Sequence, residues 1–160
     1  MLYTANAYML SIILAFFTQV VSPNLALSDT KSQYSWTEWC QQSNKDFTRS
    51  EIYLVNLISI QLSKQFDPRS CEDEQRIIEK RLATLTLSGR GIEDLSPLMV
   101  LRNSKKIESL DLSNTAVNQG EINKLKFLDS LPSFKRLRLP KVSEGQPRIL
   151  CPFRINAKCW

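Results

Sequence analysis

The sequence predicts an α/β solenoid, in which short parallel strands alternate with helical return segments. Residues 82–92 (LATLTLSGRGI) return in altered form as residues 107–117 (IESLDLSNTAV), and residues 134–139 (FKRLRL) form a third, partial copy. Each copy opens with the spacing L-x-x-L-x-L, with Ile or Phe accepted at its first position. This opening and a period of about 20–29 residues are the signature of a leucine-rich repeat. We therefore expect about three repeats that share one core.

The repeats divide the chain into four parts. We assign residues 1–28 to a signal peptide, 29–81 to a helical N-terminal cap, 82–140 to the leucine-rich repeats and 141–160 to a C-terminal cap. Caps are expected because the end of a repeat array would otherwise expose apolar surface. A disulfide is predicted to close the C-terminal cap.

The N-terminal segment predicts export. Residues 1–28 contain no Lys, Arg, Asp or Glu, and residues 8–17 (YMLSIILAFF) form an apolar run. This run has the length of a signal-peptide core and is too short for a membrane span of about 20 residues. Because no basic residue precedes the run, a retained N-terminal anchor stays open, and membrane contact is expected only in that case. The destination is the periplasm, a lumenal compartment or the medium.

Four cysteines follow the predicted signal peptide: Cys40, Cys71, Cys151 and Cys159. An even number of cysteines beside an export signal predicts two disulfides. Three pairings are possible, and the chain layout favours Cys40–Cys71 and Cys151–Cys159, one on each side of the repeats. A zinc site is the alternative, but the chain has no His and no C-x-x-C spacing. We therefore predict no metal site and no cofactor.

The N-terminal cap is predicted to hold two helices after an irregular segment at residues 29–47. Thr48 and Glu51 form a capping box at the start of the first helix. Ser70 begins the second helix, whose first turn is acidic and whose last turn is basic, as the helix dipole favours. Three aromatic side chains of the irregular segment are expected to pack over these helices: Tyr34, Trp36 and Trp39.

The repeats depart from the usual pattern at their turns. Arg90 and Thr115 hold the position of the usual buried Asn, and Ser104 stands where an apolar residue is expected. We therefore expect no ladder of hydrogen-bonded Asn side chains. Ser96 and Pro97 favour the start of a helix in the first return segment, as N-cap and first helical residue.

Residues 82–139 resemble bacterial leucine-rich repeats of the internalin-like kind, in which the I-x-D-L-S-P-L phrase of residues 92–98 recurs. The mature chain is also similar to a small exported leucine-rich-repeat family of cyanobacteria. The shared features are the Trp39-Cys40 pair, a helix before Cys71, the repeats, and a C-P-x(6)-C ending with a following aromatic residue at 151–160. The resemblance implies an exported recognition module without enzymatic activity.

The sequence contains no catalytic constellation, so we predict that the protein is not an enzyme. Without His, Ser-His-Asp and Cys-His arrangements are excluded, and no phosphate-binding or H-E-x-x-H phrase occurs. Glu108 and Asp111 are the only acidic residues that the register places together on the exposed strand face. The next strand offers Lys135 and Arg138 at the equivalent positions. We interpret these residues as two cross-strand ion pairs, each of about 0–1 kcal/mol.

The exposed face of the strands is the candidate binding surface, because ligands of this fold usually bind there. We expect it to bind a protein or peptide through six residues: Thr84, Thr86, Ser109, Arg136, Arg138 and Lys141. Of these, Arg136 faces only Ser109 in the predicted register and has no predicted partner.

The charge distribution favours an acidic partner. The chain has 21 Lys and Arg against 16 Asp and Glu, and residues 82–160 alone hold 13 against 7, a net charge of +6. Nucleic acid is not expected, because an exported protein rarely meets it. The alternative partner is an anionic glycan or the envelope surface, bound by a basic C-terminal patch of Arg136, Lys141, Arg148, Arg154 and Lys158. Dimerisation through an exposed strand edge stays open.

Overall fold

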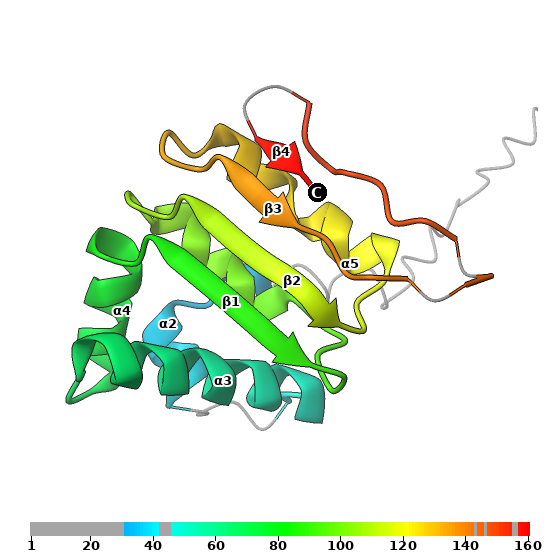
Figure 1. Ribbon diagram of the computed structural model, residues 1–160. Coiled ribbons are helices and arrows are strands. Elements are labelled where there is room, and N and C mark those ends of the chain that lie inside the picture. The colour runs from blue at the N-terminus through cyan, green and yellow to red at the C-terminus, as the bar shows by residue number, and fades with distance from the viewer. Residues whose placement is uncertain (1–30, 42–45, 143, 146, 155–156) are drawn as a thin grey trace, which may run out of the picture.

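The computed structural model describes residues 31–41, 46–142, 144–145, 147–154 and 157–160, so the predicted signal peptide lies outside the described residues. A four-stranded parallel sheet forms one side of the fold, and helical segments pack along one of its faces (Figure 1). The elements follow in chain order as η2 (Lys31–Gln33), α2 (Trp36–Cys40), α3 (Arg49–Phe66), α4 (Cys71–Lys80), β1 (Thr84–Gly89), η3 (Ser96–Asn103), β2 (Ser109–Thr115), α5 (Gln119–Lys124), η4 (Leu125–Ser130), β3 (Arg136–Arg138) and β4 (Lys158–Cys159). The predicted α/β class with parallel strands is confirmed.

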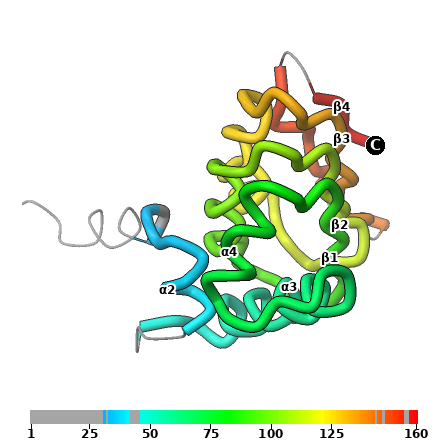
Figure 2. Tube along the Cα trace, turned by 90° about the vertical axis from the view of Figure 1, so that its left-hand side faces the viewer, coloured from blue at the N-terminus to red at the C-terminus, as the bar shows by residue number. Residues whose placement is uncertain are grey.

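The strands lie in chain order, β1-β2-β3-β4, and the middle leucines of the three sequence copies form one row. Leu85 is in register with Leu110, and Leu110 with Leu137. All three side chains are buried, together with the apolar residues of the return segments. In the view of Figure 2, the strands lie along one side of the stacked turns and the return segments lie along the other.

In the N-terminal cap, α3 packs against β1, and α4 packs against α2, α3 and η3. Thr48 and Glu51 form the predicted capping box of α3, and the buried Glu51 carboxylate also pairs with Lys31 Nζ at 2.9 Å. The Ser70 side chain caps α4 by accepting from the N–H of Asp73. Gln61 of α3 hydrogen-bonds the N–H and C=O of Thr86, so part of the outer edge of β1 is covered.

The prediction that residues 29–47 are irregular was wrong, because η2 and α2 form there. Ser35 and Glu38 make a capping box at the start of α2, in which each side chain bonds the other residue's backbone N–H. The S-x-x-E phrase was therefore a usable signal. The predicted packing of the tryptophans is confirmed, since Trp36 and Trp39 are fully buried beside α3 and α4.

Both predicted disulfides are present, and the described residues contain no free cysteine. Cys40–Cys71 joins α2 to α4, and Cys151–Cys159 closes the C-terminal tail. Two disulfides indicate an oxidising compartment, which is consistent with export. Among the described residues, no helix has the length and apolar character needed to cross a membrane.

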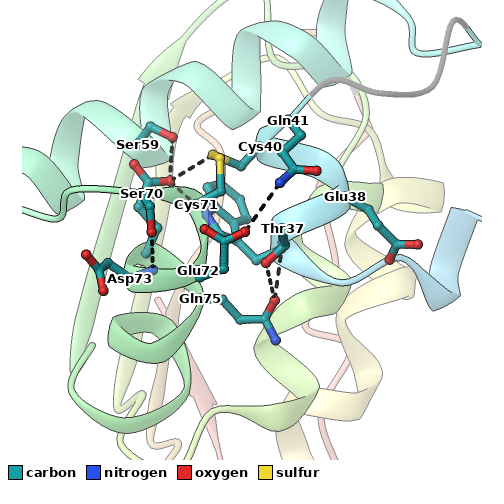
Figure 3. The surroundings of a disulfide bond; sticks show 12 residues. Thr37, Glu38, Cys40, Gln41, Ser59, Ser70, Cys71, Glu72, Asp73 and Gln75 are labelled. Atoms are coloured by element: carbon teal, nitrogen blue, oxygen red, sulfur yellow. Dashed lines mark hydrogen bonds between the residues drawn. A yellow bond between two sulfur atoms is a disulfide. The ribbon is translucent and has the colours of Figure 1, made fainter.

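A buried carboxylate, Glu74, lies beside the first disulfide. Its Oε2 atom accepts hydrogen bonds from Trp36 Nε1 and Ser59 Oγ, both at 2.8 Å, and lies 3.5 Å from Cys40 Sγ. Figure 3 shows Ser59 approaching the disulfide from α3, while further side-chain bonds link α2 to α4 around it. Glu74 therefore joins three helices at one point in the core.

The first return segment differs from the prediction at its start. Residues Ser96–Asn103 form a 3-10 helix whose N-cap is Leu95, so the assignment of Ser96 as N-cap was wrong. Asp94 explains the difference, because its carboxylate accepts from the Ser96 N–H at 2.8 Å and holds Ser96 inside the turn. Lys124 of α5 then pairs with Asp94 at 3.2 Å and links the two return segments. Side-chain oxygens also replace the Asn ladder locally, as Thr115 Oγ1 donates to the Leu112 carbonyl.

The C-terminal tail adds a fourth strand that the sequence analysis did not predict. The Lys158 N–H donates to the Lys135 carbonyl, and the Trp160 N–H donates to the Leu137 carbonyl. The ring of Phe153 packs edge-on against Phe134, with ring centres 5.6 Å apart. The tail therefore covers the end of the core.

Candidate functional site

The face of the sheet opposite the return segments carries three parallel columns of polar side chains. β1 presents the exposed hydroxyl residues Thr84, Thr86 and Ser88. The central column, on and beside β2, is acidic, and the column on and beside β3 is basic. The face therefore changes from neutral to acidic to basic across the sheet.

The acidic and basic columns meet in the two predicted ion pairs. Lys135 Nζ lies 3.2 Å from Glu108 Oε2, and Arg138 lies 3.4 Å from Asp111 Oδ2. These pairs neutralise the acidic column, so Glu108 and Asp111 have structural partners and do not form a free pair of carboxylates.

Asp111 also stabilises an irregularity between β1 and β2. The register shifts after Thr86, because Thr86 faces Asp111 whereas Ser88 faces Asn114. Asp111 Oδ1 accepts the N–H of Ser113 at 2.8 Å within this shift. Burial alone would raise the pKa of Asp111, but the hydrogen bonds from Ser113 and the charge of Arg138 outweigh it, and the pKa lies below its usual value.

The six predicted binding residues do not form one continuous patch. Thr84 and Thr86 lie on β1, and the acidic column separates them from Arg136 and Arg138 on β3. Ser109 is only 8% exposed, and its hydroxyl lies 3.1 Å from Thr84 Oγ1, so its prediction as an accessible contact was wrong. A short side chain on a central strand is covered by its neighbours on both sides.

A second group of cations gathers where β3 meets β4. Arg136 is in register with Lys158, so two exposed cations lie side by side on one face. The Arg136 guanidinium lies over the ring of Trp160, 5.8 Å from the ring centre. The prediction that Arg136 lacks a partner therefore needs correction, because the indole contacts it. The indole ring carries no charge, so Arg136 still has no ion pair among the described residues.

A hollow of about 690 Å³ opens beside this group. The C-terminal ends of β2 and β3, the segment after β3, the segment before Cys151 and the end of the tail line it. Its described lining carries three charged side chains, Arg138, Lys141 and Arg148, and no acidic one. We call it the basic hollow. Its size falls within the usual range for ligand pockets, about 300–1,000 Å³.

The structure separates the members of the predicted basic C-terminal patch. Lys141 and Arg148 line the basic hollow, and Arg136 and Lys158 lie beside it on the sheet. Arg154 is not among the lining residues, and its backbone N–H bonds the Asp129 carboxylate of η4 on the helical side. The apolar part of the hollow was not predicted from the sequence, because most of its residues come from irregular segments without periodicity.

The chemistry of this face is suited to binding. Among the described residues, no three His, Cys, Asp or Glu side chains gather into a group that would hold a metal ion. The carboxylates of the face are engaged in ion pairs, whereas Lys141 and Arg148 at the hollow have no anionic partner in the part of the chain that the structure describes. Comparison of the chain with protein-family models, curated proteins and solved structures finds no match.

Proposed function

We propose that this chain is an exported leucine-rich-repeat protein that recognises a protein or peptide partner through the uncovered face of its sheet. Three features support the repeat interpretation: the recurring L-x-x-L-x-L phrase, the in-register row of Leu85, Leu110 and Leu137, and the return segments on one face. The two disulfides support export. On this proposal, residues 1–28 are the signal peptide and the protein has no enzymatic activity.

The uncovered sheet face with its columns of charge carries the proposal most directly. A rigid sheet with exposed polar side chains presents fixed contacts to a partner at little cost in conformational entropy. The sheet is narrow, since four strands at about 4.8 Å spacing span roughly 15 Å. A surface of this width suits a peptide, a loop or the edge of a helix.

An anionic glycan or the envelope surface is the second candidate partner. The register of Arg136 beside Lys158 favours it, because like charges on neighbouring strands destabilise a sheet unless an anion lies between them. Binding led by charge weakens steeply with salt, whereas binding through packed apolar contacts does not.

Two parallel experiments test the proposed function. One selects binders from an unbiased peptide library displayed on phage, and the other measures the binding of heparin oligosaccharides. The oxidised protein should enrich peptides, and the double variant Arg136→Glu/Lys141→Glu should lose their binding. The matched control is Lys106→Glu/Lys126→Glu, which makes the same change of charge at exposed positions away from the hollow. If no peptide is enriched, or if both double variants bind as the wild type does, the proposal is wrong.

A further inference from the structure

We infer that the basic hollow binds an acidic peptide segment in which apolar side chains alternate with carboxylates. This inference rests on the proposed recognition function and specifies the chemistry of the partner. The hollow combines positive charge with exposed apolar surface in one place. Each of these two properties restricts the ligand independently.

The positive charge of the hollow has little compensation among the described residues. Within this part of the chain, Lys141 and Arg148 form no ion pair, and no Asp or Glu lines the hollow. Arg138 is held by Asp111 at the edge of the hollow, and Arg136 and Lys158 add two further charges nearby. A ligand with several carboxylates would supply the missing anions, and bonds between a guanidinium and a carboxylate are among the stronger hydrogen bonds.

The exposed apolar side chains of the molecule concentrate at the same place. Among the described residues, five large apolar side chains are exposed, and three of them line the hollow: Val142 at 39%, Leu150 at 65% and Trp160 at 54%. The disulfide Cys151–Cys159 contributes further apolar surface to the lining. Grouped apolar surface of this kind marks a contact site, because single exposed side chains are otherwise scattered.

The lining favours a peptide over a carbohydrate. Sugar hydroxyls are recognised by side chains that donate and accept hydrogen bonds, such as carboxylates and amides. Among the described residues that line the hollow there is no Asp, Glu, Asn or Gln, and the hydroxyl residue Ser113 is buried. Three cations and several apolar groups match the alternating carboxylates and apolar side chains of an extended peptide, whose successive side chains point to opposite sides.

The fluorescence of Trp160 provides a specific measurement. Trp36 and Trp39 are buried, so among the tryptophans Trp160 is the one that a quencher in solution reaches. The probe is a degenerate pool of octapeptides in which Asp or Glu alternates with Leu, Ile, Val or Phe. The control pools replace the acids by Asn and Gln, or the apolar residues by Ser. We expect the acidic pool to protect Trp160 from quenching by acrylamide. Both control pools should bind at least about tenfold more weakly than the acidic pool.

Two matched pairs of variants test the two halves of the inference. Lys141→Glu/Arg148→Glu should lower the affinity for the acidic pool by about tenfold or more, while Lys106→Glu/Lys126→Glu should leave that affinity unchanged. Leu150→Ser should lower the affinity for the acidic pool by about threefold or more. Ile60→Ser, at an exposed apolar position on α3, should leave the affinity unchanged. Protection of Trp160 by the acidic pool with this pattern of variants supports the inference.

Three other results would overturn it. Protection of Trp160 by heparin oligosaccharides but not by the acidic pool would show that the ligand of the hollow is an anionic glycan and not a peptide. Library peptides that bind without protecting Trp160 would leave the recognition function intact and move it away from the hollow. Absence of binding by the library, the pools and heparin would remove both the inference and the proposed function.

Discussion

Removal of each disulfide tests how the two caps are held. In the loop-entropy description, a cross-link stabilises the fold by restricting the unfolded chain, and the effect grows with the number of residues in the closed loop. Cys40 and Cys71 are separated by 31 residues, and Cys151 and Cys159 by 8. These loops correspond to about 3.7 and about 2.5 kcal/mol at 25 °C. We expect Cys40→Ala/Cys71→Ala to lower the free energy of unfolding by about 1 kcal/mol more than Cys151→Ala/Cys159→Ala does.

The assay is a urea titration of the oxidised protein, followed by the fluorescence of the buried tryptophans. Loss of a cross-link expands the denatured chain, so the dependence of the free energy on urea should also steepen, more for the variant without the longer loop. The reduced wild-type protein is the control, and its stability should fall below that of either double variant. A larger loss for Cys151→Ala/Cys159→Ala than for Cys40→Ala/Cys71→Ala would refute the reasoning, because the shorter loop would then contribute more.

The buried and paired carboxylates should respond to mutation and to pH. Glu74→Ala leaves the Trp36 indole N–H without an acceptor, so we expect a loss of about 1–3 kcal/mol in the same titration, and Glu74→Gln should cost less because one acceptor oxygen remains; equal losses would contradict this role. Hydrogen bonds and a nearby cation lower the pKa of Asp94 and Asp111 despite burial, so their stabilisation is complete above the ordinary Asp value of about 3.9 and is lost as the pH falls through the lowered values. A melting temperature that stays constant from about pH 5 to pH 2 would contradict this expected loss of stability. Burial would lower the pKa of Lys124, but the neighbouring carboxylates of Glu121 and Asp94 raise it above its usual value. The stabilisation by Lys124 is therefore present below about pH 10.4 and is lost as the pH rises through the raised value. Lys124→Met should remove that alkaline loss of stability in thermal melts from about pH 9 to pH 12.

The periodic part of the fold was predictable because one repeating pattern determines both burial and register. Leucines at fixed spacing indicated which side chains point inward, and the offset between copies placed equivalent residues on neighbouring strands. The ion pairs Glu108–Lys135 and Asp111–Arg138 followed from that offset alone. The pairing of the cysteines followed from their positions on either side of the repeats.

The parts that were not predicted depend on contacts between segments without periodicity. β4 is two residues long, and it is held by hydrogen bonds to β3 and by a disulfide beside it. The basic hollow combines residues from β3, the following segment and the end of the tail, and no spacing in the sequence joins them. The burial of Ser109 depends on the size of its neighbours on two other strands. α2 is an exception, since its Ser35–Glu38 capping box was visible in the sequence and was not used.

The central claim is that a partner binds the uncovered sheet face at the end where the basic hollow lies. Chemical-shift mapping of the isotope-labelled, oxidised protein with the tightest peptide from the unbiased library tests it most directly. We predict the largest shifts at Arg136, Lys141, Leu150 and Trp160, with little change at Lys126 on the helical side. Shifts concentrated on η3, η4 and α5, with none at the hollow, would contradict the account and place recognition on the opposite face.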